Sequence, residues 1–293
     1  MKKFALSALA IVFSCSLFAQ EDDLLKLVGG DSATKEYVEN AFKSSRVING
    51  HSMEMIAKGN LDFRILHRFG LINSGAKNLF GLDQASMRMG FDYGIGTNLT
   101  VGIGRSTLDK EFDGFIKWRP VRQSTGPRSF PVSIVLVTGA TINSMPWADP
   151  TRDNHFSSRV GYYHEIIVGR KFSEMFSLQL APTMVHRNLV PLASDENDVF
   201  ALGIGGRIKL SRRIAFVADY HHILSGLNKD VYHSPLSVGV DIETGGHVFQ
   251  LHFSNAQGMN EKAFITNTVD KWGDVRFGFN LSRMFVIKKP KHN

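Results

Sequence analysis

Apolar residues recur at every second position along most of the chain from Gly59 onward, and this period of two constrains the fold more than any other feature. Leu61 and Phe63, for example, alternate with Asp62 and Arg64. The same alternation recurs over residues 86–95, 99–104, 200–210 and 274–281. Because successive side chains of a strand point to opposite faces, the pattern predicts strands with two chemically different faces.

The two faces differ in a way that favours a membrane sheet. One face is apolar and aromatic, whereas the other carries glycine, serine, threonine and charges of both signs. Glycine weakens an exposed strand, but it leaves room where side chains crowd a narrow lumen. Since lipid offers the backbone no hydrogen-bonding partner, such a sheet must close on itself. We therefore expect an all-β fold, a transmembrane antiparallel up-and-down β-barrel with its polar face inside.

Connection lengths give an expected strand count and orientation. About twelve strands are expected, which places both termini on the periplasmic side. Their expected ranges are 59–70, 85–96, 98–106, 111–119, 130–141, 157–170, 175–187, 198–210, 213–223, 234–243, 247–255 and 273–287. Most short turns then fall on the periplasmic side and most long loops outside, as in known barrels. The short connection 106–110 and the long connection 120–129 break this rule, and counts of ten or fourteen strands stay open.

The N-terminus has the features of a secretory signal peptide over residues 1–19. Lys2 and Lys3 precede an apolar run of about ten residues, and Ala19 supplies a small residue at the expected cleavage site. An alternative is a lipoprotein signal with acylation of Cys15, the single cysteine of the chain. In the first reading the mature chain has no cysteine, which excludes disulfides and thiolate catalysis.

The chain between the signal peptide and the barrel, residues 20–58, has a different pattern. Tyr37, Val38, Ala41 and Phe42 recur at helical spacing, so we expect a short helix in an N-terminal arm that lies in the periplasm or in the barrel mouth. A loosely ordered arm is the alternative. The barrel is expected over residues 59–287, followed by a basic tail over residues 288–293.

Overall charge and hydropathy exclude two other classes of protein. The formal charge of +7 comes from basic residues that are scattered except in the tail, which argues against nucleic-acid binding. No stretch after the signal peptide reaches eighteen continuous apolar residues, which excludes a helical membrane protein. The expected surroundings are instead the lipid and lipopolysaccharide of the outer membrane of a Gram-negative bacterium.

The last expected strand adds a separate signal. Phe277, Phe279, Leu281 and Phe285 alternate toward an aromatic end, which resembles the signal that the outer-membrane assembly machinery reads. Arg283 departs from that pattern, and the chain continues past its usual end. The resemblance implies that the assembly machinery is a partner through the strand ending at Phe285.

Two segments resemble the opening of a known protein family. They are Val47–Ser52, with the sequence VINGHS, and Gly59–Gly70, with the sequence GNLDFRILHRFG. The family is an uncharacterised group of outer-membrane β-barrels, catalogued as a domain of unknown function, and the similarity runs from about Val47 to Phe285. It implies the location and the fold, and it assigns no catalytic or binding residue.

Charged residues on the inward row are the candidate functional residues. The lumen-lining set is Arg64, Arg68, Arg88, Asp92, Lys117, Arg119, Arg159, Glu165, Arg207, Asp219, Asp241 and Arg276. Such a row either lines a narrow channel or binding barrel for small polar or anionic solutes, or pairs into a closed barrel. The closed alternative is a structural or partner-binding barrel, with the arm contacting a periplasmic protein.

An enzyme is the third hypothesis, because His51-Ser52 and His233-Ser234 are adjacent pairs that an outer-membrane lipid hydrolase could use. Neither pair has a third residue nearby to orient the histidine, so we expect no catalytic residues. His221-His222 are neighbours on a strand and point to opposite faces, so they cannot share a metal ion. We expect no metal site and no cofactor.

Overall fold

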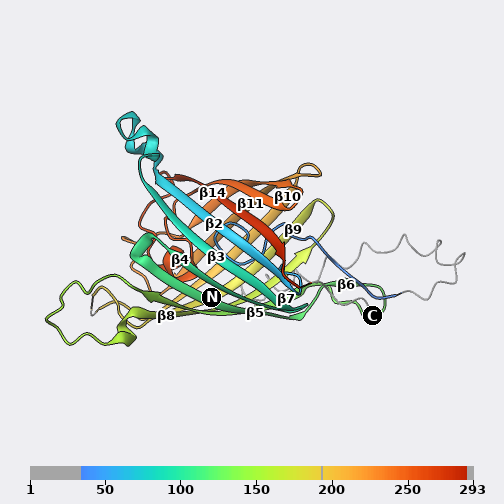
Figure 1. Ribbon diagram of the computed structural model, residues 1–293, viewed down its shortest axis with the longest axis horizontal. Coiled ribbons are helices and arrows are strands. Elements are labelled where there is room, and N and C mark those ends of the chain that lie inside the picture. Colours follow the sequence, from blue (N-terminus) through green and yellow to red (C-terminus); the bar gives the residue numbers. More distant parts are fainter. Residues whose placement is uncertain (1–33, 193, 289–293) are drawn as a thin grey trace, which may run out of the picture.

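The computed structural model describes residues 34–192 and 194–288, which form a closed antiparallel barrel of twelve strands (Figure 1). This confirms the expected fold and strand count. The barrel strands are β2 (Asn60–Leu71), β3 (Ala85–Gly96), β4 (Leu99–Ser106), β5 (Glu111–Val121), β7 (Ser133–Asn143), β8 (Val160–Lys171), β9 (Phe176–Arg187), β10 (Asp198–Lys209), β11 (Ile214–Ser225), β12 (Leu236–Thr244), β13 (His247–Ser254) and β14 (Arg276–Val286).

The barrel closes where its last strand meets its first. β14 pairs with β2 from Gly278 opposite Arg68 to Val286 opposite Asn60. Each remaining strand pairs with its neighbour in the chain, so the topology is up-and-down and leaves no open sheet edge. Among the described residues, no helix has the length and apolar character needed to cross a bilayer.

Side chains alternate between an exposed outer face and a buried inner face along every barrel strand. On β8, for example, Tyr162 and Ile166 are exposed, whereas Tyr163 and Ile167 are fully buried. The inner face is less uniformly polar than the sequence pattern predicts. Its apolar side chains come mainly from β7 to β11, and the reason lies inside the lumen: an apolar part of the N-terminal segment packs against them.

The long connection that broke the expected pattern of loop lengths has a structural role. It contains β6 (Ser124–Thr125), which pairs antiparallel with β1 (Glu36–Tyr37) of the N-terminal arm outside the barrel. Figure 1 shows this small sheet at the end of the barrel opposite the projecting connection 72–84. The β6 end also holds the turn between β3 and β4 and the start of β2, which makes it the periplasmic end.

The helix expected over residues 34–42 is wrong. The described chain there contains β1 and then an irregular segment, because tertiary contacts outweigh helical spacing. The Val38 N–H donates to the Gln123 carbonyl, and the Tyr37 ring lies under the Arg122 guanidinium. A short helix does exist elsewhere, as α2 (Glu261–Thr266) in the loop between β13 and β14.

Three expectations concern residues outside the described ranges. These are the signal peptide over residues 1–19, the alternative role of Cys15, and most of the basic tail over residues 288–293. The first barrel strand begins at Asn60 and the last ends at Val286, each within one residue of the expected barrel boundaries.

Candidate functional site

The last part of the N-terminal segment, residues 41–56, lies inside the barrel and fills its lumen (Figure 1). We call residues 41–56 the plug. Its backbone folds back on itself, because the Glu54 carboxylate accepts hydrogen bonds from the Ala41 and Phe42 N–H groups at 2.6 and 3.2 Å. At its tip a tight turn is closed by the Val47 N–H, which donates to the Gly50 carbonyl at 2.9 Å.

One side of the plug is held by charged groups of the barrel wall. The Asp219 carboxylate accepts from the N–H groups of Asn49 and Gly50 at 2.8 and 2.9 Å. The Lys117 ammonium donates to the carbonyls of Ser45 and Glu54 at 3.1 and 2.6 Å. Since a buried backbone group without a partner is costly, these wall residues satisfy the plug where it has no regular secondary structure.

Amide side chains of the wall complete the same polar contact. Gln179 accepts from the Met53 N–H at 2.9 Å and donates to the His51 carbonyl at 2.6 Å. Gln250 donates to the Val47 carbonyl at 2.6 Å. Side chains from several barrel strands therefore form hydrogen bonds with the plug backbone.

The other side of the plug is apolar and depends on small residues in the wall. Phe42, Val47 and Met53 belong to one buried cluster with wall side chains of β7 to β10 and with Phe264 and Ile265 of α2. A Cβ at Gly205 would lie 2.9 Å from Val47 Cγ2, and one at Gly169 would overlap the Met53 sulfur. Glycine on the inner face thus makes room for the plug, as the sequence pattern predicts for a crowded lumen.

The external loop that carries α2 closes the lumen at the external end, opposite the end that holds the β1–β6 sheet. Arg46 of the plug and Glu261 of α2 form an ion pair at 2.7 Å, and their side chains are 2 % and 1 % exposed. The His51 ring lies 3.3 Å from the same guanidinium through Nε2. The same Nε2 lies 3.5 Å from the Glu261 carboxylate, so His51 adjoins both partners of the ion pair. Plug and external loop therefore meet inside the barrel through one buried ion pair.

The structure brings eleven of the twelve lumen-lining candidates together on the buried inner wall. Arg64 pairs with Asp62, Arg88 with Asp113, and Arg276 with Asp270, each at 2.5 Å. Arg159 differs: it lies at the external end of the barrel, outside β8, with its guanidinium 3.7 Å from the centre of the Trp147 ring. The buried candidates, beside Arg64, Arg88 and Arg276, are Arg68, Asp92, Lys117, Arg119, Glu165, Arg207, Asp219 and Asp241.

Several important residues were not among the sequence candidates. Asn49, Gln179, Gln250 and Asn280 join wall to plug but are uncharged, and the search had selected ionisable groups. Their position was readable in part, because Gln179, Gln250 and Asn280 lie on inward positions of their strands. Nothing in the strand pattern placed the plug itself in the lumen.

Residues 42–285 match the family model described as a membrane bound beta barrel domain, DUF5777. The chain belongs to this family. The match begins within the plug and ends in β14, so the family's shared segment includes most of the plug as well as the barrel. No curated protein matches the chain.

The chain is similar to solved outer-membrane proteins at low sequence identity, and it shares its fold with the NanC porin. The NanC porin has a TM-score of 0.50 at 8 % identity, over 76 % of this chain and 98 % of that chain. The toluene transporter TbuX of Ralstonia pickettii has a TM-score of 0.40 at 10 % identity, over 83 % and 97 % of the two chains. OmpT of Vibrio cholerae has a TM-score of 0.39 at 8 % identity, over 78 % and 99 %. The DUF5777 chain is an outer-membrane β-barrel with a porin-like fold, in a Gram-negative outer membrane.

The adjacent histidine and serine pairs of this DUF5777 barrel do not form hydrogen-bonded dyads. Ser52 Oγ donates to the Ser44 carbonyl at 2.6 Å, and Ser234 Oγ accepts from the Ile223 N–H at 3.2 Å. Within residues 34–192 and 194–288, no group of three histidine, cysteine or acidic residues is placed to hold a metal ion.

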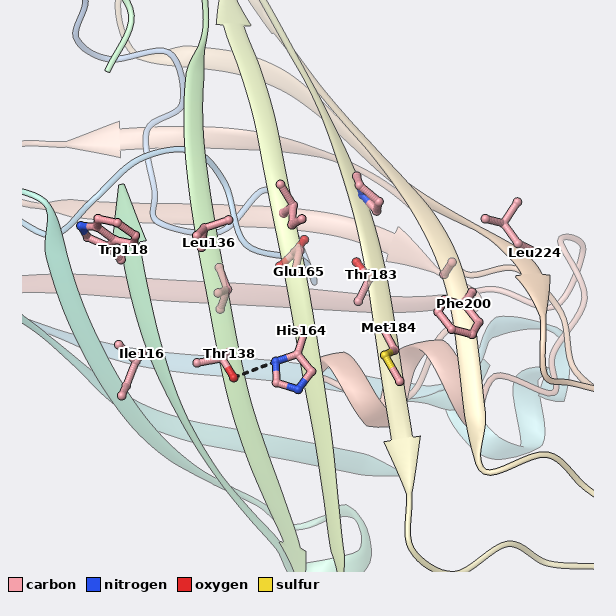
Figure 2. A pocket seen from close by; sticks show the side chains of 14 residues that line it. Ile116, Trp118, Leu136, Thr138, His164, Glu165, Thr183, Met184, Phe200 and Leu224 are labelled. Carbon is pink, nitrogen blue, oxygen red and sulfur yellow. Dashed lines mark hydrogen bonds between the residues drawn. The ribbon is translucent and has the colours of Figure 1, made fainter. Parts of the chain in front are cut away.

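A polar pair on the outer wall accounts for a histidine that the sequence left unexplained. Figure 2 shows His164 of β8 beside Thr138 of β7 in an apolar, lipid-facing hollow, joined by a hydrogen bond of 2.9 Å. Pro182 of β9 lies nearby, and the β8–β9 register is interrupted opposite it, because proline has no N–H to donate. The ladder of the DUF5777 barrel is therefore locally weakened between β8 and β9, whereas the β7–β8 ladder that holds the His164–Thr138 pair is continuous.

Proposed function

We propose that this outer-membrane barrel is a gated channel for small polar solutes, anions among them, and that the plug is its gate. The observation that supports the proposal is the hydrogen-bonded contact between the plug backbone and charged or amide side chains of the wall. Those side chains would line a hydrated path if the plug left. The proposal assigns no catalytic role to any residue.

Physical reasons favour a movable plug over a permanent filling. A narrow barrel can be filled by its own inward side chains, whereas this wall keeps glycine where the plug inserts. The net worth of each neutral hydrogen bond to the plug is only about 0.5–1.5 kcal/mol, because water replaces it when the plug leaves. The polar contacts on one side of the plug can thus be exchanged for water, whereas the apolar contacts on its other side favour the closed state.

A disulfide that ties the plug to the wall tests the proposal. In Val47→Cys with Gly205→Cys, a sulfur at the position of Val47 Cγ2 would lie 2.9 Å from a Cβ at residue 205, about the separation that a disulfide requires. Residues 20–293 contain no other cysteine. We expect ion currents through the reduced double variant in a planar bilayer, and loss of these currents on oxidation.

The single variants Val47→Cys and Gly205→Cys are the controls, and their currents should not respond to oxidant. Currents that persist unchanged through the oxidised double variant would exclude the plug as the gate. Silence of wild type and reduced variant at all voltages, from protein shown to be folded and inserted, would favour the second candidate.

That second candidate is a closed, partner-binding barrel, and the small sheet outside the barrel favours it. β1 and β6 present the half-exposed Tyr37 ring at the periplasmic end, where a periplasmic protein could bind. The assembly machinery is a separate proposed partner, through β14 and its aromatic end at Phe285. Loss of a periplasmic partner from pull-downs with Tyr37→Ser, but not with Leu210→Ser, would support a partner-binding role; Leu210 is exposed in the turn between β10 and β11 at the same end of the barrel.

A further inference from the structure

A polar hollow lies between the N-terminal arm and the periplasmic rim of β8 to β10, near the β6 end in Figure 1. It encloses about 660 Å³, and we call it the periplasmic basin. Its cationic lining residues are Lys43, Arg170, Lys171, Arg207 and Lys209. Its acidic lining residues are Glu36, Glu39 and Glu174.

Most of the acidic groups are already engaged. Glu174 forms an ion pair with Lys171 at 2.6 Å, and the hydrogen bond from Lys171 lowers the pKa of the Glu174 carboxyl. Glu39 pairs with Arg122, which lies outside the basin. Among the cations, Lys43 pairs with Glu243, also outside the lining. The charges left over in the basin are therefore mainly positive.

Arg207 is the unusual member of this set. It is only 3 % exposed, yet within the described chain no carboxylate oxygen lies within 4.0 Å of it. Among the described residues it makes one long hydrogen bond, 3.4 Å from Nη1 to the Ala41 carbonyl, and its Nε has no partner there. A buried charge is costly unless it is paired, and the carboxylates of Asp241 and Glu243 act on this guanidinium only from beyond ion-pair distance.

Two neighbouring cations also have no carboxylate oxygen within ion-pair distance in the described part of the chain. Arg170 and Lys209 line the basin, and neither has a carboxylate oxygen within 4.0 Å among the described residues. The Arg170 Nε is also buried without a partner. Three cations without acidic partners thus surround one hollow, and a guanidinium presents a planar fork that matches an oxyanion.

We propose that the periplasmic basin is a binding site for a small oxyanion, a carboxylate or a phosphate, with Arg207 as its central ligand. The site deepens the proposed function, since it names a solute class at the periplasmic mouth of the lumen. Binding does not require an open barrel, so it is measured independently of conduction. Because Arg207 also contacts Ala41 of the plug, the bound anion and the plug share one side chain.

Isothermal titration of the folded mature protein in zwitterionic detergent, with inorganic phosphate and with succinate, tests the site. Wild type should show saturable binding of at least one of the two anions. Arg207→Gln should weaken it at least about tenfold, the effect expected when a charge-assisted hydrogen bond is lost. Arg170→Gln, on a half-buried side chain, should weaken it as well and covers the case in which Arg207→Gln fails to fold.

Arg212→Gln is the matched control, since it removes the same charge from an exposed turn at the same end of the barrel. Its affinity should equal that of wild type. A second arm replaces the free anions with short-chain phosphatidylglycerol, observed by native mass spectrometry, with phosphatidylcholine as the neutral comparison. Binding of phosphatidylglycerol alone, lost in Arg207→Gln, would assign the oxyanion to a lipid headgroup and support the site.

Absence of saturable binding in all arms would overturn the inference, as would equal losses in Arg207→Gln and Arg212→Gln. Either result leaves the disulfide test of the gate untouched. Conversely, a barrel that never conducts but binds phosphate through Arg207 would refute the gate and keep the binding site.

Discussion

The buried pair between Arg46 and Glu261 permits the sharpest prediction about the closed state. Glu261→Gln keeps an oxygen that can accept from Arg46 Nη1 but removes the negative charge, leaving a buried guanidinium beside a neutral amide. Removing one partner of a buried ion pair costs about 3–5 kcal/mol. At the lower limit, the population with an undocked plug should rise about a hundredfold, since 1.4 kcal/mol corresponds to a factor of ten.

Modification of a cysteine in the plug measures that population. Val47 is buried against the wall, so a water-soluble maleimide reaches Val47→Cys only when the plug undocks. The labelling rate should therefore rise by about two orders of magnitude when Glu261→Gln is added. Adding Arg46→Met to Glu261→Leu should recover part of the protection, because no charge is then left unpaired.

Glu174→Gln is the matched control for this measurement. Glu174 pairs with Lys171 at 2.6 Å, almost the Arg46–Glu261 distance, but its side chain is 79 % exposed. An exposed pair contributes about 0–1 kcal/mol, so labelling should change little. If Glu261→Gln and Glu174→Gln gave the same labelling rate, the ion pair would not hold the plug and the reasoning from burial would fail.

Three further variants test the wall. Gly94→Ala should lower the free energy of unfolding by about 1–3 kcal/mol, because its Cβ would lie 2.5 Å from the Ile56 carbonyl oxygen. Its urea midpoint should fall, whereas that of Gly96→Ala should change little. Equal midpoints would refute the close contact. Pro182→Ala should restore a ladder N–H to β9 and add about 1 kcal/mol, seen as slow amide exchange at residue 182; rapid exchange there would contradict it. His164→Leu should stabilise the barrel in lipid by about 1 kcal/mol, since it removes a polar group from the apolar face. A lower unfolding midpoint of this variant would argue that His164 has a partner in the membrane.

The barrel could be predicted from the sequence because its rule is local. A strand that faces lipid on one side and polar groups on the other must alternate, and residues 60–71 or 276–286 show that alternation without reference to the rest of the chain. Turn lengths then gave the order and orientation of the strands. Inward charges such as Arg64 and Arg88 followed from the same alternation.

An arm in the barrel mouth was one of the two placements that the sequence allowed, but the conformation of the plug could not be predicted because it depends on distant residues. Its backbone groups bond to Lys117, Gln179 and Asp219, which lie far away in the chain. The helical spacing around Tyr37 is a weak preference that pairing with β6 outweighs. α2 was missed for a similar reason, since a helix of six residues inside a long loop has little periodicity of its own.

The position of the two buried partners in the chain links closure of the barrel to sealing of its lumen. Arg46 lies in the segment just before β2, and Glu261 lies in the segment just before β14. β2 and β14 are the strands that pair to close the barrel, so their pairing brings the segments that carry Arg46 and Glu261 together. During assembly, the ion pair would be completed only in a barrel whose ends have joined around a correctly inserted N-terminus. A chain that closed with its plug outside would leave Glu261 without its cation, and would thereby differ in stability from the finished molecule.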